Sequence, residues 1–521
     1  MLPPPPAAGA PGALARPRPE AGISVWTLYV DHQLLRPSCD DYALERRACG
    51  GGAGTAYRTL EDASRAAMPG TQVVVREGTF TRPFAPARSG TPGAFVVYRS
   101  HPGETVTFTG IAEEPALLIK DRAYLAFVGF TVTDVGSWGR LENAEWITIR
   151  GNRFTAARAR GTRGGLKLVR SRHTVIVDNA FEEGNDNLVV QESDRNLVQG
   201  NVFRRGRHSL LSIRCGSLNV VRGNWFSNER QKAAEVYDCE GVSDAPVRLD
   251  ATRRNLFEDN VFALTRGAGQ PHRYNGIQYA GQFGIVRRNV FHDNHGGGLR
   301  FHVYPQEALH NYGHRVYRNT FFMNRCFAVS SSAGRGAHFG DTVLDGNLFY
   351  RNTGCAGQPA QTGVENAAAV VLRHNALLDA AAASPFRDAE ARDLRLRPGV
   401  ALVDAGGFLA RTMSSGSGTA LAVDDVKWFF LDSAGVDPAG GDLVQLEGDT
   451  VRARIVGIDY ITGVLTLDRP LTFTAGQGLA LAYEGRAPDM GAYEFTAEST
   501  GLSPWTAPGL AFRGLRLSGR R

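Results

Sequence analysis

Lysine is scarce in this chain of 521 residues, because arginine supplies nearly all of the 58 basic side chains. The lysines are Lys120, Lys167, Lys232 and Lys427. No stretch of 18 apolar residues occurs, which excludes a membrane-spanning helix. The chain also lacks the C-x-x-C spacing of zinc sites, the collagen period and the heptads of coiled coils, so these three classes are excluded as well.

The charge of the chain is positive, with a net value of +6 and an isoelectric point of about 9.0. The excess of arginine has two interpretations, codon bias or a surface adapted to a polyanion, since guanidinium groups bind carboxylates and phosphates through paired hydrogen bonds. No basic run or known nucleic-acid motif occurs, so nucleic acid is not an expected partner. Hydrophobic residues make up 43% of the chain, which is enough for a large core.

The six cysteines form three local pairs. Their spacing predicts the pairs Cys39 with Cys49, Cys215 with Cys239, and Cys326 with Cys355. An even number of cysteines in local pairs favours disulfides and an oxidising compartment, while six buried free thiols are the alternative. Residues 1–22 read as a disordered Pro/Ala-rich linker without the apolar core of a signal peptide. The cysteine pairs, together with the family resemblance described below, indicate an extracellular or periplasmic location.

A short phrase recurs through the middle of the chain: a β-branched run, an asparagine, any residue, and then an apolar or aromatic residue. The repeated asparagines are Asn152, Asn179, Asn201, Asn224, Asn260, Asn289, Asn319, Asn347 and Asn375. Their spacing is typical of one coil of a parallel β-solenoid with three short strands, whereas the blades of a propeller need ~40 residues. We predict that the asparagines stack in one turn and that the Phe or Leu two positions later is buried.

The ends of such a solenoid need covers, because a bare end exposes unpaired strand edges. Residues 56–68 have the apolar pattern of a capping helix, and the solenoid with this cap is predicted over 23–405. Alternating segments within 418–485 predict a small antiparallel β-module, so 406–495 is assigned to this module and a closing strand. Residues 496–521 are predicted to be an irregular basic tail.

With these parts placed, the chain resembles the pectate-lyase-like superfamily. The matching segments are YRTLEDASRAAMPGTQVVVREGTF, SGTPGAFVVYRSHPGETVTFTG, the repeated N-x-F phrase and APDMGAYEF. The resemblance implies an all-β fold, a right-handed parallel β-helix, and an activity among polysaccharide lyases, glycosidases, epimerases or non-catalytic surface proteins. The carboxylate motifs of polygalacturonases, the D-P-H-D motif of mannuronan epimerases and the W-I-D-H motif of classical pectate lyases are missing.

Parity along three consecutive coils predicts which side chains face outward. Positions 13 and 11 before the repeated asparagine are apolar in all three coils, which places them inward. These residues are Leu166, Leu168, Leu188, Val190, Leu211 and Ile213. The positions between them face outward, so Lys167, Gln191 and Arg214 are predicted to lie on one outer sheet.

Later coils extend this outer strip less regularly, because their lengths change. A shift of 24 positions, which aligns Cys239 with Cys215, places Lys232 level with His208. The remaining candidates on the strip are Glu235, Tyr237, Asp238, Gln278, Tyr279, Arg300 and His302. A strip across about six coils, roughly 25–30 Å at ~4.8 Å per coil, suits an oligosaccharide better than a small metabolite.

The resemblance favours β-elimination from a uronic-acid polymer. This reaction needs a cation for the substrate carboxylate, a base for the C5 proton and an acid for the leaving oxygen. Lys232 or Lys167 is the expected base, and Arg214 and Arg300 are the expected carboxylate clamps. His208, Tyr237 or His302 is the expected proton donor. Gln191, Glu235, Gln278 and Tyr279 are expected to bind substrate.

Other roles and functions stay open. Glu235 and Asp238 are candidate ligands for Ca²⁺, and Asp186 with Asn187 and Glu192 is either a calcium site or a set of turn residues. No organic cofactor is expected. The favoured function is a monomeric polysaccharide lyase acting on an acidic polysaccharide. The alternatives are a glycoside hydrolase using Glu192, Glu235 or Asp238, and a non-catalytic, adhesin-like glycan-binding protein.

Overall fold

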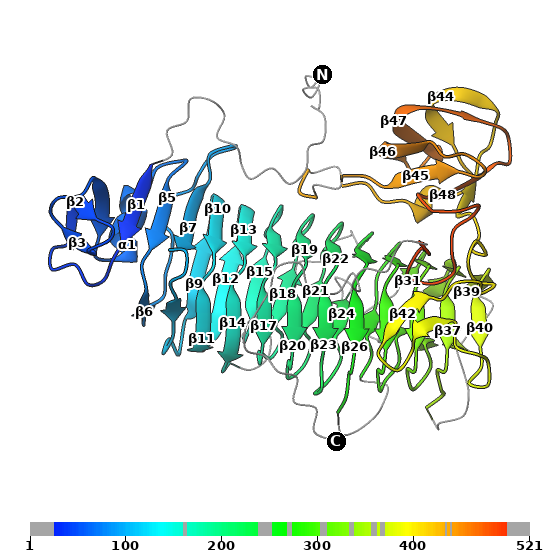
Figure 1. The fold of residues 1–521 in the computed structure, drawn as a ribbon, viewed down its shortest axis with the longest axis horizontal. Helices are drawn as coiled ribbons and strands as arrows, with labels where there is room; N and C mark the ends of the chain where they lie inside the picture. The colour runs from blue at the N-terminus through cyan, green and yellow to red at the C-terminus, as the bar shows by residue number, and fades with distance from the viewer. Residues whose placement is uncertain are drawn as a thin grey trace.

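The computed structural model describes residues 26–159, 164–237, 253–267, 274–302, 310–332, 338–355, 362–364, 370–432, 435–437 and 440–496. Three long sheets of parallel strands wind around one axis, so the central region is a parallel β-helix, with a small module beside its C-terminal half (Figure 1). No helix in this part of the chain is long and apolar enough to cross a membrane.

From β9 (Pro115–Lys120) onward, successive coils contribute strands to three sheets, which we name A, B and C. Sheet A contains β1 (Thr27–Val30), β5 (Gln72–Val75), β7 (Val96–Ser100), β10 (Ala123–Val128), β13 (Glu145–Arg150), β16 (Val175–Val177), β19 (Leu197–Gln199), β22 (Val220–Arg222), β25 (Leu256–Glu258), β28 (Ile285–Arg287), β32 (Arg315–Tyr317), β36 (Thr342–Asp345) and β39 (Val370–Arg373). Sheet B contains β6 (Gly78–Phe80), β8 (Val106–Phe108), β11 (Thr131–Val135), β14 (Arg153–Ala157), β17 (Ala180–Glu182), β20 (Val202–Arg204), β23 (Trp225–Ser227), β26 (Val261–Ala263), β29 (Val290–His292), β33 (Thr320–Phe322), β37 (Leu348–Tyr350) and β40 (Ala376–Leu378).

Sheet C, which carries the predicted outer strip, has ten strands. These are β9 (Pro115–Lys120), β12 (Ser137–Glu142), β15 (Leu166–Val169), β18 (Leu188–Gln191), β21 (Leu211–Arg214), β24 (Ala234–Tyr237), β27 (Ile277–Tyr279), β30 (Leu299–His302), β34 (Val329–Ser332) and β38 (Thr362–Val364). Two short pairs lie outside the three sheets: β31 (His310–Tyr312) with β35 (His338–Gly340), and β41 (Phe386–Asp388) with β42 (Asp393–Leu396).

The repeated asparagines stack in the turn between sheets A and B, as predicted. From Asn152 to Asn375, the side-chain and backbone N–H groups of each asparagine donate to the Oδ1 atom of the next, at 2.9–3.0 Å. This ladder satisfies buried polar groups in every coil, which a solenoid turn cannot do with strand pairing alone.

The phenylalanine that follows each ladder asparagine stacks in the interior. Eight rings, from Phe154 to Phe349, lie 4.7–5.0 Å apart between centroids and are nearly parallel. The last member of the series is an exception. Leu377, predicted to be buried, is 52% exposed because its strand β40 is the terminal strand of sheet B and no further coil covers it.

Two shorter asparagine ladders flank the first one. The sequence analysis did not predict them. Asn196, Asn219 and Asn255 form one ladder, and Asn294, Asn324 and Asn352 form the other. Each member lies five positions before or after an asparagine of the main ladder, a second period that the sequence shows when its coils are aligned.

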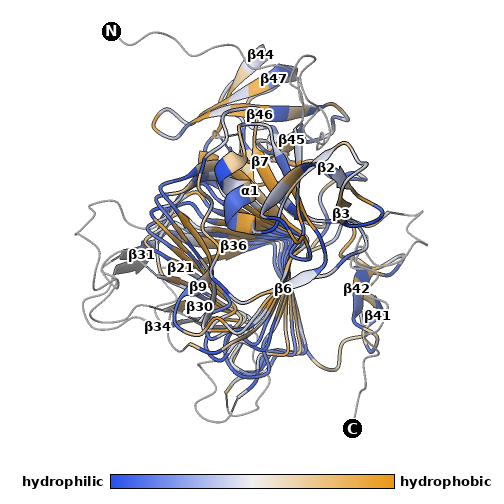
Figure 2. Cartoon of the chain, turned by 90° about the vertical axis from the view of Figure 1, so that its left-hand side faces the viewer, coloured by the Kyte–Doolittle hydropathy of each residue, from blue (hydrophilic) through white to orange (hydrophobic). Residues whose placement is uncertain are grey.

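The N-terminal end of the solenoid has the predicted helical cap. Helix α1 (Leu60–Ala66) begins after Thr59, whose side chain accepts a hydrogen bond from the backbone N–H of Asp62. Leu60 and Ala63 face the core, and Figure 2 shows α1 near the N-terminal end of sheet A. Strands β2 (Ser38–Ala43), β3 (Ala48–Cys49) and β4 (Gly54–Tyr57) extend the edge of the same sheet.

Two of the three predicted disulfides are confirmed. Cys39 bonds Cys49 between β2 and β3, with the Cα atoms 6.0 Å apart, and Cys326 bonds Cys355 one coil later. Cys215 is disulfide-bonded, but its predicted partner, Cys239, lies outside the described residues.

The predicted antiparallel module is a six-stranded sheet. Its elements are β43 (Ala410–Arg411), β44 (Gly416–Ala422), the 3₁₀ turn η5 (Val426–Trp428), β45 (Leu443–Leu446), β46 (Arg452–Asp459), β47 (Val464–Phe473) and β48 (Gly478–Leu481). Its apolar residues share one core with the outward side chains of the C-terminal half of sheet A, among them Leu256 and Ile285. The module is therefore docked on the solenoid through a continuous apolar interface.

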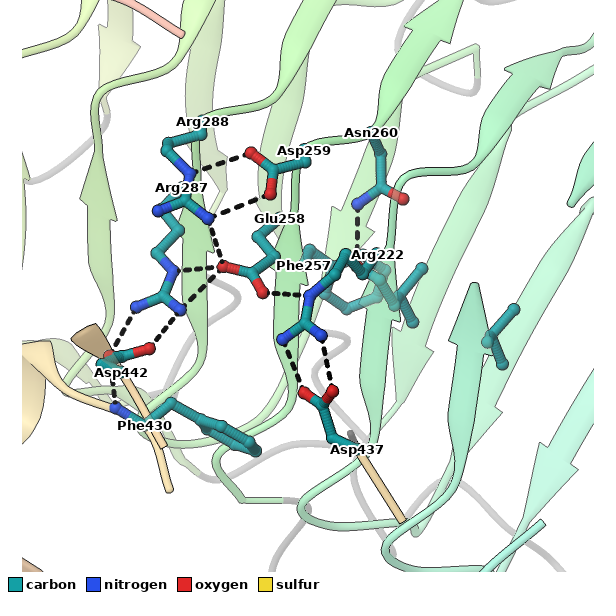
Figure 3. Close-up of polar contacts among 12 residues, drawn as sticks. Arg222, Phe257, Glu258, Asp259, Asn260, Arg287, Arg288, Phe430, Asp437 and Asp442 are labelled. Carbon is teal, nitrogen blue, oxygen red and sulfur yellow. Dashed lines mark hydrogen bonds and ion pairs between the residues drawn. The ribbon is translucent and has the colours of Figure 1, made fainter. Parts of the chain in front are cut away.

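Buried ion pairs reinforce this interface (Figure 3). Glu258 contacts Arg222, Arg287 and Arg288 within sheet A. The module contributes Asp442, which binds both terminal nitrogens of Arg287 at 2.6 and 2.7 Å, and Asp437, which binds Arg222. The two arginines that contact the module, Arg222 and Arg287, are thus each paired with a carboxylate of the module, as buried charges require.

Candidate functional site

Two rows of outward side chains run along sheet C. One row brings Arg140, Lys167, Val189, Ser212, Glu235, Gln278, Arg300 and Ser330 into register on successive strands. The other aligns Glu142, Val169, Gln191, Arg214 and Tyr237. The six residues predicted to point inward, from Leu166 to Ile213, all belong to the solenoid core, whereas Val169 and Val189 do not, so the inward assignment is confirmed.

Glu235 lies at the centre of a polar cluster on this face. Its Oε1 atom accepts a hydrogen bond from the hydroxyl of Ser212 at 2.8 Å and from Nη2 of Arg214 at 3.1 Å. Its Oε2 atom lies 2.7 Å from the ammonium of Lys232. His208 approaches Oε1 with Nδ1 at 3.8 Å. One fully buried carboxylate therefore faces three cationic or protonatable groups.

These neighbours determine the charge of Glu235. Burial alone would raise the pKa of this carboxyl, but the charges of Lys232, His208 and Arg214 outweigh burial and hold the pKa well below its usual range. Glu235 is therefore an anion in the folded protein, and it is suited to orienting cations rather than to donating a proton.

Asp186 is a second buried carboxylate in the cluster. Its Oδ1 atom is 2.8 Å from Nδ1 of His208, and its Oδ2 atom is 3.4 Å from Nη2 of Arg214. Asp186 is 1% exposed, whereas the His208 side chain is 35% exposed. The pairing fixes one ring nitrogen of His208 toward the protein and leaves Nε2 without a hydrogen bond to the described residues.

Tyr237 and Gln278 complete the cluster on the side of Lys232. The Lys232 ammonium donates to the Tyr237 hydroxyl at 3.5 Å and to Oε1 of Gln278 at 3.4 Å. The guanidinium of Arg214 lies over the Tyr237 ring, 5.6 Å from its centroid. The cluster thus spans three neighbouring strands, β21, β24 and β27.

The structure brings together six of the predicted site residues: His208, Arg214, Lys232, Glu235, Tyr237 and Gln278. Lys167 is not among them, because β15 is three strands away from β24, about 14 Å at ~4.8 Å per strand. Lys167 and Gln191 instead line an open hollow of about 670 Å³ on the same sheet. Arg300 follows Gln278 in register on β30. His302 ends β30 beside Ser332, and Asp238 lies outside the described residues.

Two details of the sequence analysis were wrong. Tyr279, predicted to bind substrate, is fully buried in the core between Phe257, Phe301 and His314, because position 279 has inward parity on β27. The shift between β21 and β24 is 23 positions and not 24, since Leu211 pairs with Ala234. Lys232 consequently aligns with Ser209, one position after His208.

Ser212 was missed as a site residue, and Asp186 was considered only as a calcium ligand or turn residue. Register could have found Ser212, since it lies directly beside Glu235. Asp186 precedes its strand, and only the folded coil shows that its carboxylate meets His208 and Arg214.

The cluster does not fit Ca²⁺. The ligand atoms of Asp186, His208 and Glu235 lie within 4.8 Å of one another. However, Lys232 and Arg214 already contact these carboxylates, and Ca²⁺ prefers oxygen ligands to an imidazole nitrogen. Cys39 and Cys49 form a similar group with Asp41, but their sulfur atoms are joined in a disulfide.

Comparison with known proteins agrees with this architecture. Residues 117–304 match the family model described as a right-handed β-helix region. Together with the three-sheet coil, this match makes the solenoid a right-handed parallel β-helix, the fold that the sequence resemblance implied.

The individual similarities are distant or short. The uncharacterized protein YwoF of Bacillus subtilis (strain 168) is 31% identical over 102 residues, and the match spans 18% of this chain and only 22% of that protein. Pectate lyase Pel9A superimposes with a TM-score of 0.48 at 14% identity, covering 91% of this chain and 98% of its own. The alginate lyase AlyGC gives 0.45 at 18% identity, covering 65% and 54%, and the GH136 lacto-N-biosidase from Eubacterium ramulus gives 0.44 at 10% identity, covering 68% of each chain. None of these similarities supports a statement about the activity of this chain.

Proposed function

We propose that this protein is a polysaccharide lyase that cleaves a uronic-acid-containing polymer by β-elimination at the cluster around Glu235. The observation that carries the proposal is the set of cations around one buried, ionised carboxylate on the outer face of sheet C. This arrangement holds Arg214 and Lys232 at fixed positions, as stabilisation of a developing negative charge requires. The disulfides favour action outside the reducing cytoplasm.

Arg214 is suited to neutralising the carboxylate of the substrate. Its Nε atom donates to Ser212, and its Nη2 atom contacts Glu235 and Asp186, so the guanidinium is held on one side. The N–H groups of Nη1 make no hydrogen bond within the described part of the chain. They can therefore bind a substrate carboxylate and stabilise the enolate-like charge that develops when the C5 proton leaves.

His208 is the base that the geometry favours. Asp186 binds Nδ1, which leaves Nε2 of a partly exposed ring available to take the C5 proton. Lys232, a base expected from the sequence, would have to give up its ion pair with Glu235 to accept a proton. We therefore assign proton abstraction to His208 and the positioning of its ring to Asp186.

Tyr237 is suited to protonating the leaving oxygen. Its hydroxyl accepts a hydrogen bond from the Lys232 ammonium, which would stabilise the phenolate left after the proton is transferred. In the complete step the C5–H electron pair forms the C4–C5 double bond, the C4–O bond breaks, and the released oxygen takes the Tyr237 proton. Proton gain at His208 balances proton loss at Tyr237.

The products decide between this proposal and a glycoside hydrolase. We expect ultraviolet-absorbing unsaturated uronate ends when the protein is incubated with a panel of polyuronates and uronate-containing glycosaminoglycans. Arg214→Ala and His208→Ala should abolish this signal. The exposed ion-pair variant Arg158→Ala should retain it. Reducing ends without ultraviolet absorbance would establish a hydrolase and reject the proposal, and no turnover of any polymer would favour a binding protein.

A further inference from the structure

The outer face of sheet A carries two parallel rows of side chains from β7 to β28. One row, in register from strand to strand, contains Arg99, Val128, Arg150, Val177, Gln199, Arg222, Glu258 and Arg287. The row beside it is mainly apolar and contains Val97, Ala126, Thr148, Val175, Leu197, Val220, Leu256 and Ile285. The face thus repeats an arginine-bearing row next to an apolar row.

The C-terminal half of this face shows what such a surface binds. The module places the carboxylates of Asp437 and Asp442 on Arg222 and Arg287, and it places apolar side chains on the apolar row from Leu197 onward. A ligand that combines carboxylates with an apolar surface is therefore already complementary to this pattern within the molecule.

The N-terminal half of the same face forms an open hollow of about 790 Å³. It is lined by Gln72, Phe95, Val97, Arg99, Ala126, Val128, Thr148 and Arg150. The buried Nε atom of Arg99 has no hydrogen-bond partner among the described residues. Arg150 is exposed, and among the described residues its side chain forms an ion pair only with Asp178, at 3.7 Å. The two guanidinium groups lie on β7 and β13, two strands apart, or about 10 Å at ~4.8 Å per strand.

We propose that this hollow is a second binding site for an acidic glycan, separate from the cluster on sheet C. The carbon-bound hydrogens of sugar rings would cover Val97, Ala126 and Val128, while carboxylates spaced along the polymer would bind Arg99 and Arg150. The ligand class rests on the proposed function. The site itself rests on the register, the hollow and the unpartnered Arg99 nitrogen.

A glycan fits this hollow better than an acidic peptide does. The strands under the hollow, β5, β7, β10 and β13, are each hydrogen-bonded on both sides, so no sheet edge is free to pair with a peptide backbone. A peptide would bury unpaired N–H and C=O groups against the apolar row, which costs free energy. A sugar ring exposes an apolar face without that cost.

The test separates binding from cleavage by using the inactive His208→Ala background. We compare that protein with Arg99→Ala/Arg150→Ala and with Thr148→Trp, which fills the hollow while keeping both charges, each in the same background. Retention on immobilised polyuronate should fall at least fivefold in both variants, and Arg158→Ala should not change it. In the parent background the double variant should cleave short oligosaccharides at the parental rate but cleave the polymer more slowly.

Different outcomes would overturn the second binding site or the proposed function separately. Unchanged retention of both variants removes the site, and competition by polyglutamate as strong as that by polyuronate assigns the surface to acidic peptides. A concentration-dependent dimer that only these variants lose assigns it to a second copy of the chain. If no polymer is cleaved but the variants still lose retention, the proposed function fails while the second site stands. Circular dichroism melting curves confirm that the variants fold.

Discussion

Glu235 and Glu258 are both fully buried carboxylates surrounded by three cationic or protonatable side chains, yet they lie in opposite settings. Glu258 lies on sheet A under the C-terminal module, where Asp437, Asp442 and Asp259 neutralise its arginines (Figure 3). Glu235 lies on sheet C, where His208 and Arg214 keep 35% and 22% of their side chains exposed. In both cases neighbouring cations lower the pKa of the carboxyl against the effect of burial.

The difference between the two clusters shows how a buried charge cluster at a structural interface can be distinguished from one at a functional site. A perturbed pKa is common to both clusters, so it identifies neither. At Glu258 the donors of Arg287 are divided between Glu258, Asp442 and Tyr317, whereas at Glu235 the Nη1 donors of Arg214 and the Nε2 atom of His208 are left over within the described residues. Unused donors and acceptors on exposed side chains are what a substrate can bind.

The largest expected effect is that of His208→Ala on turnover. Loss of a general base should lower kcat by roughly 10²–10⁴-fold on the cleaved polyuronate, with KM changing much less. Steady-state kinetics measures this, and His374→Ala, which removes a half-exposed histidine in the turn after β39, is the matched control.

Lys232→Ala is the rival variant. If Lys232 takes the proton, this variant should lose turnover as strongly as we expect for His208→Ala, and His208→Ala should keep most of it. That result would exchange the two assignments. Asp186→Asn should lower kcat and shift its pH profile, because Asp186 orients the base without touching substrate.

Glu258→Gln should have the second largest effect, on stability. Removing a charge from a buried cluster leaves its partners uncompensated, which costs about 3–5 kcal/mol. Denaturant unfolding measures this loss. Glu145→Gln breaks the exposed ion pair with Arg172 and should cost under about 1 kcal/mol. Activity per folded molecule should stay unchanged in Glu258→Gln, and a selective loss of activity would contradict the comparison.

Glu494, a carboxylate whose side chain is 24% exposed, shows the opposite pKa shift. Among the described residues its cationic neighbour is Arg318, at 3.7 Å, and Asp489 lies nearby. Burial dominates here and raises its pKa to about 7, from the ordinary value of 4.5. The direction of the shift thus follows the number and closeness of the cations.

Glu494 should make stability depend on pH. A pKa raised on folding adds stability below pH 4.5, and this contribution is lost as pH rises toward 7 and beyond. The effect is at most about 3 kcal/mol at ~1.4 kcal/mol per pKa unit. Unfolding curves between pH 4.5 and 8 should show the decline, and Glu494→Gln should flatten it. An equal slope in the variant would assign the dependence to other groups.

Local patterns predicted the fold well. The phrase around each ladder asparagine, such as Asn201 with Phe203, lies within one short segment, so spacing and parity were enough to place it. Tyr279 was proposed together with its neighbour Gln278 without a parity assignment, and parity would have placed it inward. Alignment on Cys239 shifted Lys232 by one position, because the coil length changes there. The Glu258 cluster was not predictable, since Asp437 lies 215 positions from its partner Arg222.

Removal of divalent cations should have the smallest effect of all. In the Glu235 cluster Lys232 and Arg214 already supply the positive charge next to Asp186 and Glu235, and a further cation among them would be repelled at distances under 5 Å. We therefore expect a chelator to change kcat by less than twofold, and added Ca²⁺ to leave the melting temperature unchanged. If the chelator abolishes activity and Ca²⁺ restores it, a metal ion helps Arg214 to neutralise the substrate carboxylate. The Glu235 cluster would then differ from the Glu258 cluster by its bound ion, and not by the unpaired donors of Arg214.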